Sequence, residues 1–243
     1  MTKTILISGG TSGIGKAAAK QLLQDGFKVA AFSREPAKVK KLKDELAKDF
    51  SPEQFLILTG DITNETSVKN VVGKTVKTFS RIDVLFNNAG YGYFTPVDKV
   101  DIKKFEAMIA TNLVGQAILT KRVSPIMKKQ KSGTIINLVS ISGKKSYAWG
   151  EFYAATKFGL MGYSEGLRDE LKDFGIKVAT VCPGMVKTNF FTAKELQRRM
   201  KRLHLTKKPP MLNPEDVARA VSLIANQSSV SDIQDLTIMP FNI

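Results

Sequence analysis

Short apolar runs alternate along the chain with longer segments in which apolar residues recur every three or four positions. The short runs are rich in isoleucine, valine, leucine and phenylalanine, and they predict buried β-strands at residues 5–7, 29–32, 55–58, 84–86, 134–138, 178–181 and 236–239. Near-continuous apolar runs are typical of strands that are covered by helices on both faces.

The longer segments predict helices at residues 14–25, 36–48, 67–79, 103–128 and 152–174. Asn64 and Thr66 are candidate caps of the third helix, and Asn213 followed by Pro214 opens a last helix. Strands that alternate with helices of this length form βαβ units and a parallel sheet. We therefore predict an α/β fold, a doubly wound Rossmann-type sheet in a single domain spanning residues 1–243.

The length of 243 residues and the hydrophobic content of 43% suit one domain with a buried core. A single cysteine, Cys182, rules out an intramolecular disulfide and a zinc site built on cysteines. A single histidine, His204, rules out a metal site with two histidine ligands. We expect no metal site, with Cys182 packed as a small apolar residue and His204 facing solvent.

The N-terminal residues run directly into the first apolar segment, without a charged leader before a long apolar stretch. No window holds the roughly 18 apolar residues that a membrane-spanning helix needs. We therefore expect a soluble, cytoplasmic protein without a signal peptide and without a membrane partner.

The net charge of +15 favours anions such as phosphates, nucleic acids or acidic carriers. The alternative is that lysine is simply abundant on exposed helix faces, as at residues 38–45. No recognition motif, zinc spacing or interleaving of aromatic and basic residues supports a nucleic-acid binder, so we expect no nucleic-acid partner.

A glycine-rich turn, Ser8-Gly9-Gly10-Thr11-Ser12-Gly13-Ile14-Gly15, joins the first predicted strand to the first predicted helix. Glycines permit a tight turn and let backbone amides approach a pyrophosphate, and the helix N-terminus adds a favourable dipole. The spacing is Gly-x-x-x-Gly-x-Gly, so a dinucleotide site is predicted and a plain glycine-rich turn is the alternative.

The second predicted strand ends at Ser33 and Arg34, where NAD-binding folds usually place an acid for the ribose 2′-hydroxyl. Ser33 is not acidic, Glu35 comes one residue too late, and the Arg34 guanidinium can pair bidentately with a 2′-phosphate. NADP(H) is therefore the expected cofactor, and an ordinary surface arginine is the alternative.

Tyr153 and Lys157 are four residues apart, so they lie on the same face of one predicted helix. A free phenol has a pKa of about 10, and an ammonium one turn away stabilises the phenolate and lowers that pKa. Ser140 follows the strand predicted at residues 134–138, and its hydroxyl can bind a substrate oxygen as charge develops.

With these motifs, the sequence resembles the short-chain dehydrogenase/reductase family from residue 8 to residue 188. The other matching motifs are Asp61, Asn87-Asn88-Ala89-Gly90, Asn112 and Pro183-Gly184 with Thr188, and no catalytic position departs from the family pattern. The resemblance implies an oxidoreductase that transfers a hydride between NADP(H) and a carbonyl or secondary alcohol.

The resemblance also implies roles for individual residues. Tyr153 is the proton donor or acceptor, Lys157 lowers its pKa and bonds the nicotinamide ribose, Ser140 polarises the carbonyl, and Asn112, in the long helix, holds a relay water. Asp61 and Ile62 flank the adenine. The full set of implied cofactor-binding residues is Gly9, Thr11, Ser12, Gly13, Ile14, Gly15, Ser33, Arg34, Asp61, Ile62, Asn88, Ala89, Gly90, Tyr153, Lys157, Pro183, Gly184, Val186 and Thr188.

The segment at about 189–211 is a substrate-covering loop by the same resemblance. It is crowded with basic residues: Lys194, Arg198, Arg199, Lys201, Arg202, Lys207 and Lys208. A basic cover favours an anionic substrate such as a hydroxy acid or a phosphopantetheine carrier, and a solvated helix face is the alternative. Tyr147 and Trp149 either line the substrate pocket or fill a loop.

The C-terminal part of the chain narrows the subclass. Residues 235–241 lack the glycine-rich tail of many 3-oxoacyl reductases, and with residues 213–217 they resemble the 3-hydroxy acid or serine dehydrogenase subgroup. A 3-oxoacyl reductase, a reductase of bulkier ketones and a non-catalytic NADP(H)-sensing regulatory protein stay open. The resemblance further implies a homodimer or homotetramer formed through the two long helices, 103–128 and 152–174.

Overall fold

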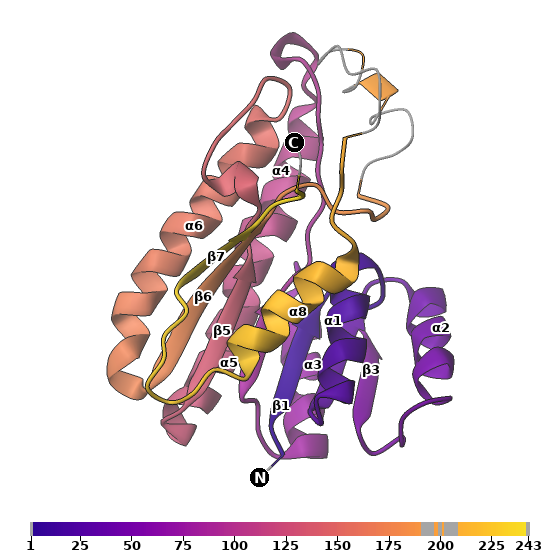
Figure 1. Ribbon diagram of the computed structural model, residues 1–243, viewed down its shortest axis with the longest axis vertical. Helices are drawn as coiled ribbons and strands as arrows, with labels where there is room; N and C mark the ends of the chain where they lie inside the picture. The colour runs from indigo at the N-terminus through magenta and orange to yellow at the C-terminus, as the bar shows by residue number, and fades with distance from the viewer. Residues whose placement is uncertain (1, 191–196, 199–200, 202–208, 242–243) are drawn as a thin grey trace.

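The computed structural model describes residues 2–190, 197–198, 201 and 209–241. Its centre is one sheet of seven parallel strands, in the order β3-β2-β1-β4-β5-β6-β7 (Figure 1). The strands are β1 (Thr4–Ser8), β2 (Lys28–Ser33), β3 (Phe55–Thr59), β4 (Val84–Asn87), β5 (Gly133–Leu138), β6 (Ile176–Pro183) and β7 (Asp235–Ile238). All seven predicted strands are therefore confirmed, with ends that differ by one or two residues.

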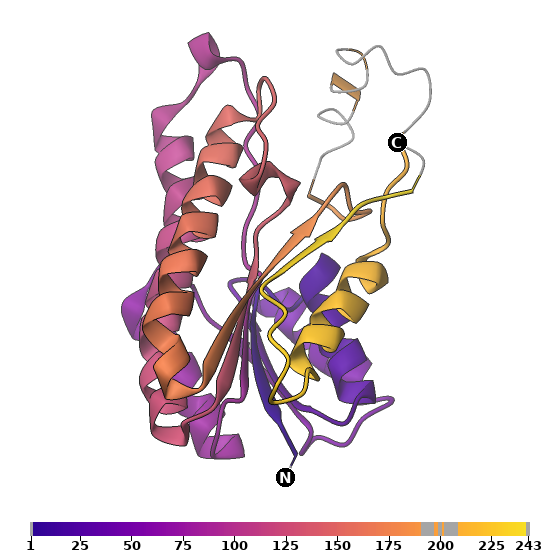
Figure 2. The ribbon, with the colours of Figure 1, turned by 60° about the vertical axis from the view of Figure 1, so that its left-hand side comes forward.

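Helices cover both faces of the sheet, which Figure 2 shows as a thin layer between them. One face carries α1 (Gly13–Gln24), α2 (Pro36–Leu46) and α8 (Pro214–Ala225), and the other carries α3 (Glu65–Phe79), α5 (Gly115–Gln130) and α6 (Glu151–Leu171). The doubly wound Rossmann-type fold is confirmed.

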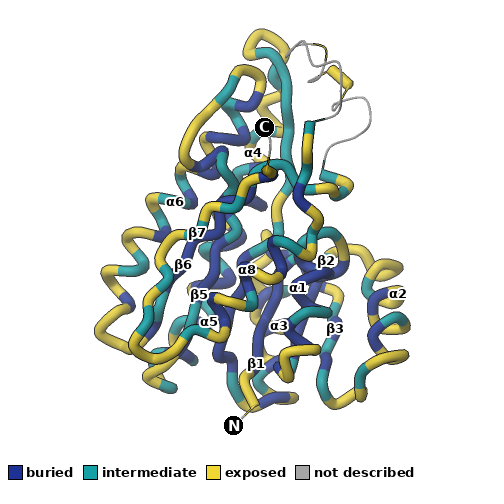
Figure 3. The backbone as a smooth tube through the Cα atoms, in the orientation of Figure 1, coloured by how far each residue is buried: buried dark blue, intermediate teal, exposed yellow. Residues whose placement is uncertain are grey.

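Alternate residues of each strand feed two separate cores. Ile5 and Ile7 of β1 pack with α1 and α8, whereas Leu6 packs with α3 and α5, and none of the three has exposed surface. The central strands are accordingly buried along their length in Figure 3. Because each such side chain contributes about 1.5–3 kcal/mol on burial, β1 is a firmly held platform for the turn that follows it.

The chain order changes direction beside β1. From β1 the chain moves outward to β2 and β3, and then returns to β4 on the other side of β1. At such a switch point the following segments go to opposite faces of the sheet, so a crevice opens between the carboxyl ends of the two strands. The fold therefore places a binding crevice after Ser8 and Asn87.

The long helix predicted at residues 103–128 is wrong as a single regular helix. The structure has α4 (Ile102–Ile109), a π-helical turn (Ala110–Val114) and α5, and the N–H of Gly115 donates to the carbonyl of Ala110. A π turn holds one extra residue, and apolar periodicity does not reveal such an insertion.

Helix caps match the sequence in part. The Asn64 side chain accepts a hydrogen bond from Ser67 N at 2.8 Å and caps α3, whereas Thr66 lies inside the helix and is not a cap. Asn213 and Asp216 form a capping box at the start of α8. Among the described residues, no helix is long and apolar enough to cross a membrane.

The two flanks of the predicted substrate-covering segment are joined by backbone hydrogen bonds. Lys187 N donates to Leu212 O at 2.8 Å, and Leu212 N donates to Met185 O at 2.9 Å. Most of the segment itself lies outside the described residues, as do His204 and, of the basic residues, Lys194, Arg199, Arg202, Lys207 and Lys208.

Candidate active site

A cleft of about 780 Å³ lies across the carboxyl ends of the strands. Its "β2 end" is defined here by Ser33 and Arg34, and its "α6 end" by Ser140, Tyr153 and Lys157. All the predicted site residues line the cleft except Gly15, Asp61 and Asn112. The cleft wall therefore holds most of the predicted site residues, which come from the ends of β1 to β6, the turns that follow these strands, and α6.

The turn between β1 and α1 is held open by a missing side chain at Gly15. A Cβ atom there would lie 2.4 Å from Gly9 O and 2.5 Å from Asn88 Nδ2, closer than any real contact. Gly9 itself has φ +65°, which a residue without Cβ adopts at no cost. Gly15 therefore does not line the cleft, but it lets the turn lie flat against the end of β4.

Side-chain hydrogen bonds tie this turn to β4. Asn88 Nδ2 donates to Ser8 O at 2.8 Å and to Gly9 O at 3.0 Å, and the Ser8 hydroxyl accepts from the backbone N–H groups of Asn88 and Ala89 at 3.0 Å. On the far side, Gln116 Nε2 donates to Ala89 O at 2.6 Å. These bonds fix the two walls of the switch-point crevice against each other.

The β2 end carries several cations, of which Arg34 is exposed and forms no ion pair among the described residues. Lys16 is paired with Glu45 at 2.5 Å, and Lys38 with Glu35 at 2.7 Å. Thr11 Oγ1 donates to Ser33 Oγ at 2.8 Å, which holds the glycine-rich turn against the end of β2. The β2 end therefore offers an anion the Arg34 guanidinium, next to the hydroxyls of Thr11 and Ser33.

At the α6 end, Tyr153 and Lys157 lie on one face of α6, as their spacing predicts. Both are buried, with Tyr153 6% and Lys157 3% exposed, and Lys157 Nζ lies 5.8 Å from the centre of the Tyr153 ring. The ammonium group donates to the carbonyl of Leu138, the last residue of β5, at 2.8 Å. The lysine is thus anchored to the strand that delivers Ser140.

Burial dominates the protonation of both groups. It raises the pKa of Tyr153 well above its usual range, while the hydrogen bond with the Ser140 hydroxyl lowers it in part and the nearby Tyr147 raises it further. Burial also lowers the pKa of Lys157, to about 8. The pKa of Tyr153 is therefore raised, whereas Lys157 alone was expected to lower it. Burial destabilises the phenolate more than the neighbouring groups stabilise it.

Ser140 is held in a strained backbone conformation. Its φ of 126° and ψ of 158° lie in a region that is essentially confined to glycine, at a cost of about 1–3 kcal/mol. The Ser140 hydroxyl also accepts from Ser142 N at 3.1 Å. Strain of this kind persists where surrounding structure over-determines it, and here it aims the hydroxyl at Tyr153.

Asn112 lies in the π-helical turn and is fully buried. Its Nδ2 donates to Tyr91 O at 2.9 Å and to Thr156 Oγ1 at 3.1 Å, and its Oδ1 accepts from Tyr91 N at 3.0 Å. The amide therefore holds the loop after β4 against α6, the helix that carries Tyr153 and Lys157.

Asp61 stabilises the turn in which it lies. Its carboxylate accepts from Thr63 N at 2.9 Å and from the Thr63 hydroxyl at 2.8 Å, and its neighbour Ile62 is the residue that reaches the cleft.

Cys182 is buried, as expected, and its thiol pKa is raised to about 11, mainly by burial.

Sequence reasoning missed two rings beside Tyr153. Phe94 and Phe190 lie with their centroids 5.6 Å and 5.4 Å from the Tyr153 ring. Phe190 belongs to the segment at about 189–211 that is predicted to cover the substrate, but nothing singled it out there, and Phe94 belongs to no predicted strand, helix or motif. Tyr147, which the sequence left between pocket and loop, does line the cleft.

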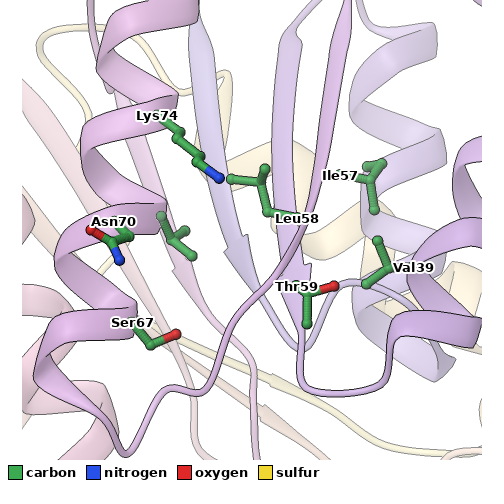
Figure 4. A pocket seen from close by; sticks show the side chains of 8 residues that line it. Val39, Ile57, Leu58, Thr59, Ser67, Asn70 and Lys74 are labelled. Atoms are coloured by element: carbon green, nitrogen blue, oxygen red, sulfur yellow. The ribbon is translucent and has the colours of Figure 1, made fainter.

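A second hollow, of about 360 Å³, lies between α2, the edge strand β3 and α3 (Figure 4). Its lining combines aliphatic side chains with Thr59, Ser67, Asn70 and Lys74. No predicted site residue lies in it, and it is separate from the cleft.

Comparison with known proteins shows similarity to dehydrogenases. The family model for short chain dehydrogenases matches residues 3–199. The serine 3-dehydrogenase of Agrobacterium fabrum (strain C58 / ATCC 33970) is 32% identical over 243 residues, which is all of this chain and 95% of that protein. The NADP-dependent 3-hydroxy acid dehydrogenase of Schizosaccharomyces pombe (strain 972 / ATCC 24843) is 33% identical over 242 residues, or 98% of this chain and 92% of that protein.

A solved structure, a closed form of serine dehydrogenase complexed with NADP+, superposes with a TM-score of 0.88 at 30% identity. The match covers 99% of this chain and 96% of that one. The similarity therefore extends over the sheet, the helices and the cleft together.

Proposed function

The chain belongs to the short chain dehydrogenase family, and from that premise we propose that it transfers a hydride between NADP(H) and a carbonyl or secondary alcohol. The observation that carries the proposal is the convergence of Ser140, Tyr153 and Lys157 at one end of the cleft, with Arg34 at the other. A phenol, a hydroxyl and an ammonium in this arrangement suit proton transfer to an oxygen whose carbon is reduced.

The residues of the cleft fit a dinucleotide phosphate. The glycine-rich turn at the start of α1 leaves backbone amides near the cleft, and Arg34 suits the 2′-phosphate that distinguishes NADP(H) from NAD(H). The relative from Schizosaccharomyces pombe is named as NADP-dependent, and the matching serine dehydrogenase structure contains NADP+. When bound, the cofactor supplies or accepts the hydride.

The protein's own groups handle the proton and the carbonyl oxygen. The Tyr153 hydroxyl donates a proton to the substrate oxygen during reduction, and the Ser140 hydroxyl, already hydrogen-bonded to Tyr153, donates to the same oxygen. Lys157 stabilises the phenolate that results, because its ammonium lies 5.8 Å from the phenol ring. Asn112 keeps α6 and the loop after β4 in place.

The test is NADPH oxidation with a panel of ketones and 3-oxo acids, compared between the wild type and Tyr153→Phe. We expect turnover by the wild type and a loss of roughly 100-fold to 10,000-fold in kcat for the variant, because general acid catalysis contributes about that much. Tyr163→Phe on the same helix is the matched control and keeps full activity. Full activity of Tyr153→Phe would reject the proposed proton donor.

The alternative of an NADP(H)-sensing protein without turnover predicts a different result. It requires tight NADPH binding with no oxidation of NADPH by any substrate of the panel. The two relatives described above are both named as dehydrogenases, and their names make serine and 3-hydroxy acids the first substrates to test.

A further inference from the structure

Three aromatic rings meet at the α6 end of the cleft. Phe94, Tyr153 and Phe190 lie with their centroids 5.4 to 6.1 Å apart, all within the range in which ring edges and faces attract each other. The proton donor of the proposed reaction is thus one ring of a cluster. Any substrate oxygen that reaches the Tyr153 hydroxyl brings its neighbouring atoms close to the other two rings.

Of these two phenylalanines, Phe190 lines the cleft, and the Phe94 ring packs against it edge to face with the centroids 6.1 Å apart. Phe190 N donates to the Thr188 hydroxyl at 3.3 Å, which fixes the ring two residues after a predicted cofactor-binding residue. Phe190 therefore lies close to Thr188 in the sequence and beside the Tyr153 ring in space, with the two ring centroids 5.4 Å apart. We expect a group attached to the reacting carbon to contact this ring when the substrate oxygen reaches the Tyr153 hydroxyl.

Two glycines, Gly92 and Gly150, leave room for the aromatic rings. A Cβ atom on Gly92 would lie 2.4 Å from the Phe94 ring and 2.9 Å from the Phe190 ring, and one on Gly150 would lie 2.4 Å from the Tyr147 ring. Since any other residue would displace the rings, the backbone of both loops is shaped to accept them. The aromatic lining is a built feature, not a chance contact of surface side chains.

Backbone contacts hold the two loops together. Thr95 N donates to Trp149 O at 3.2 Å, which links the loop of Phe94 to the loop of Tyr147. Trp149 keeps φ at +66°, a conformation that bulky residues rarely adopt. The loop geometry is maintained although it is strained, as is common where a binding surface depends on it.

Most of the charged side chains of the cleft lie at the end away from the aromatic rings. Lys16, Lys20, Arg34 and Lys38 line the β2 end, far from the rings along the strand order. At the α6 end, the Lys157 ammonium donates to Leu138 O, and Tyr147, Met185 and Phe190 line the wall beside it. Ser142, Lys187 and Asn189 also line the cleft here, so the three residues named above form the aromatic and apolar part of a mixed wall.

We infer that Phe190, supported by Phe94 and joined by Tyr147, forms a substrate pocket that selects ketones or secondary alcohols with an apolar ring attached to the reacting carbon. This inference rests on the proposed hydride transfer. It opposes a small polar substrate such as serine. It uses Phe190 from the start of segment 189–211 and does not depend on the basic residues of that segment.

The experiment uses four ketones that separate the effect of a ring from the effect of a charge. Butanone is small and neutral, acetoacetate is small and anionic, and replacing the acyl methyl group of each by cyclohexyl gives a neutral and an anionic ketone with a ring. Initial rates of NADPH oxidation by the full-length enzyme give kcat/KM for each. We expect the ring to raise kcat/KM by about 10-fold to 100-fold in both the neutral and the anionic pair.

Variants then assign that preference to the rings. Phe190→Ala lowers kcat/KM for the two cyclohexyl ketones by about 10-fold or more and changes the two small ketones by less than about threefold, while Phe190→Leu restores most of the loss. Phe174→Ala, which alters a partly exposed ring after α6, is the control and leaves the ratio unchanged. NADPH binding, measured by fluorescence, stays the same in all three variants.

The outcomes separate the two proposals. No turnover of any of the four ketones, or of the serine and 3-hydroxy acid substrates, would contradict the proposed function itself. Turnover with a ratio near one between ring-bearing and small ketones, or a ratio that Phe190→Ala does not change, would overturn the aromatic pocket alone. Preference for both acids regardless of the ring would also overturn it and would favour recognition of charge.

Discussion

The two ends of the cleft are built from different parts of the polypeptide. Next to the β2 end, the turn from β1 to α1 supplies mostly main chain and lies against β4 through Gly15 and Asn88. We call this turn, together with Ser33 and Arg34, the main-chain end. The α6 end is made of side chains, where rings from three loops surround Tyr153. A site made of main chain leaves little room for substitution, whereas a site made of side chains can change its substrate while the fold stays intact.

Gly15→Ala is the strongest test of the main-chain end. A methyl group 2.4 Å from Gly9 O must push the turn away from β4, so we expect NADPH to bind about 100-fold more weakly. Gly73→Ala is the matched control, because a Cβ there meets nothing within 4 Å and alanine favours the helix. NADPH titration by fluorescence measures both. Unchanged affinity in Gly15→Ala would mean that the turn adapts like a loop.

Arg34→Ala sharpens the comparison, because Arg34 is a side chain within the main-chain end. We expect the ratio of kcat/KM for NADPH to that for NADH to fall by about tenfold, the effect of one exposed charge-assisted hydrogen bond, with the rate on NADH nearly unchanged. Lys40→Ala, another exposed cation on α2, should leave the ratio as it is. Equal use of NADPH and NADH by the wild type would contradict this role for Arg34.

The smallest expected effect concerns Lys157, whose burial makes the free energy of unfolding depend on pH. Burial lowers the pKa of Lys157 to about 8 in the folded state, below the ordinary lysine value of 10.5, so folding favours the neutral amine. Below pH 8 the cost of burying the ammonium is fully present, and stability rises with pH between about 8 and 10.5. Relative to Lys157→Met, the wild type should gain about 1 kcal/mol from pH 8 to 9.

Urea unfolding of both proteins at several pH values measures this difference. Subtracting the Lys157→Met curve removes the contribution of groups that titrate alike in both. Parallel stability profiles would contradict a depressed pKa for Lys157.

The main-chain end could be predicted from the sequence because its signals are local. A strand, a glycine-rich turn and a helix follow each other within residues 4–24, and Ser33 and Arg34 directly follow the next strand. The same holds for Tyr153 and Lys157, since helical spacing alone puts them on one face.

The rest depends on contacts between distant segments. Phe94 and Phe190 meet because β4 and β6 end at the same edge of the sheet, and the only sequence signal for either residue is that Phe190 falls in the predicted substrate-covering segment. The pKa of Tyr153 also depends on how completely its surroundings exclude water. No local sequence pattern predicts the φ of 126° at Ser140 either.

The π-helical turn at Ala110–Val114 holds one residue more than a regular helix would. The widened turn absorbs that residue, so α5 keeps the face on which Gln116 meets Ala89 O and Thr120 meets Asn87 Nδ2 at 3.0 Å. The extra residue falls in the stretch that places the Asn112 amide between Tyr91 and Thr156. A one-residue deletion here would therefore leave the packing of α5 on the sheet in place and disturb the position of Asn112 alone, so the fold would survive a change that the site does not.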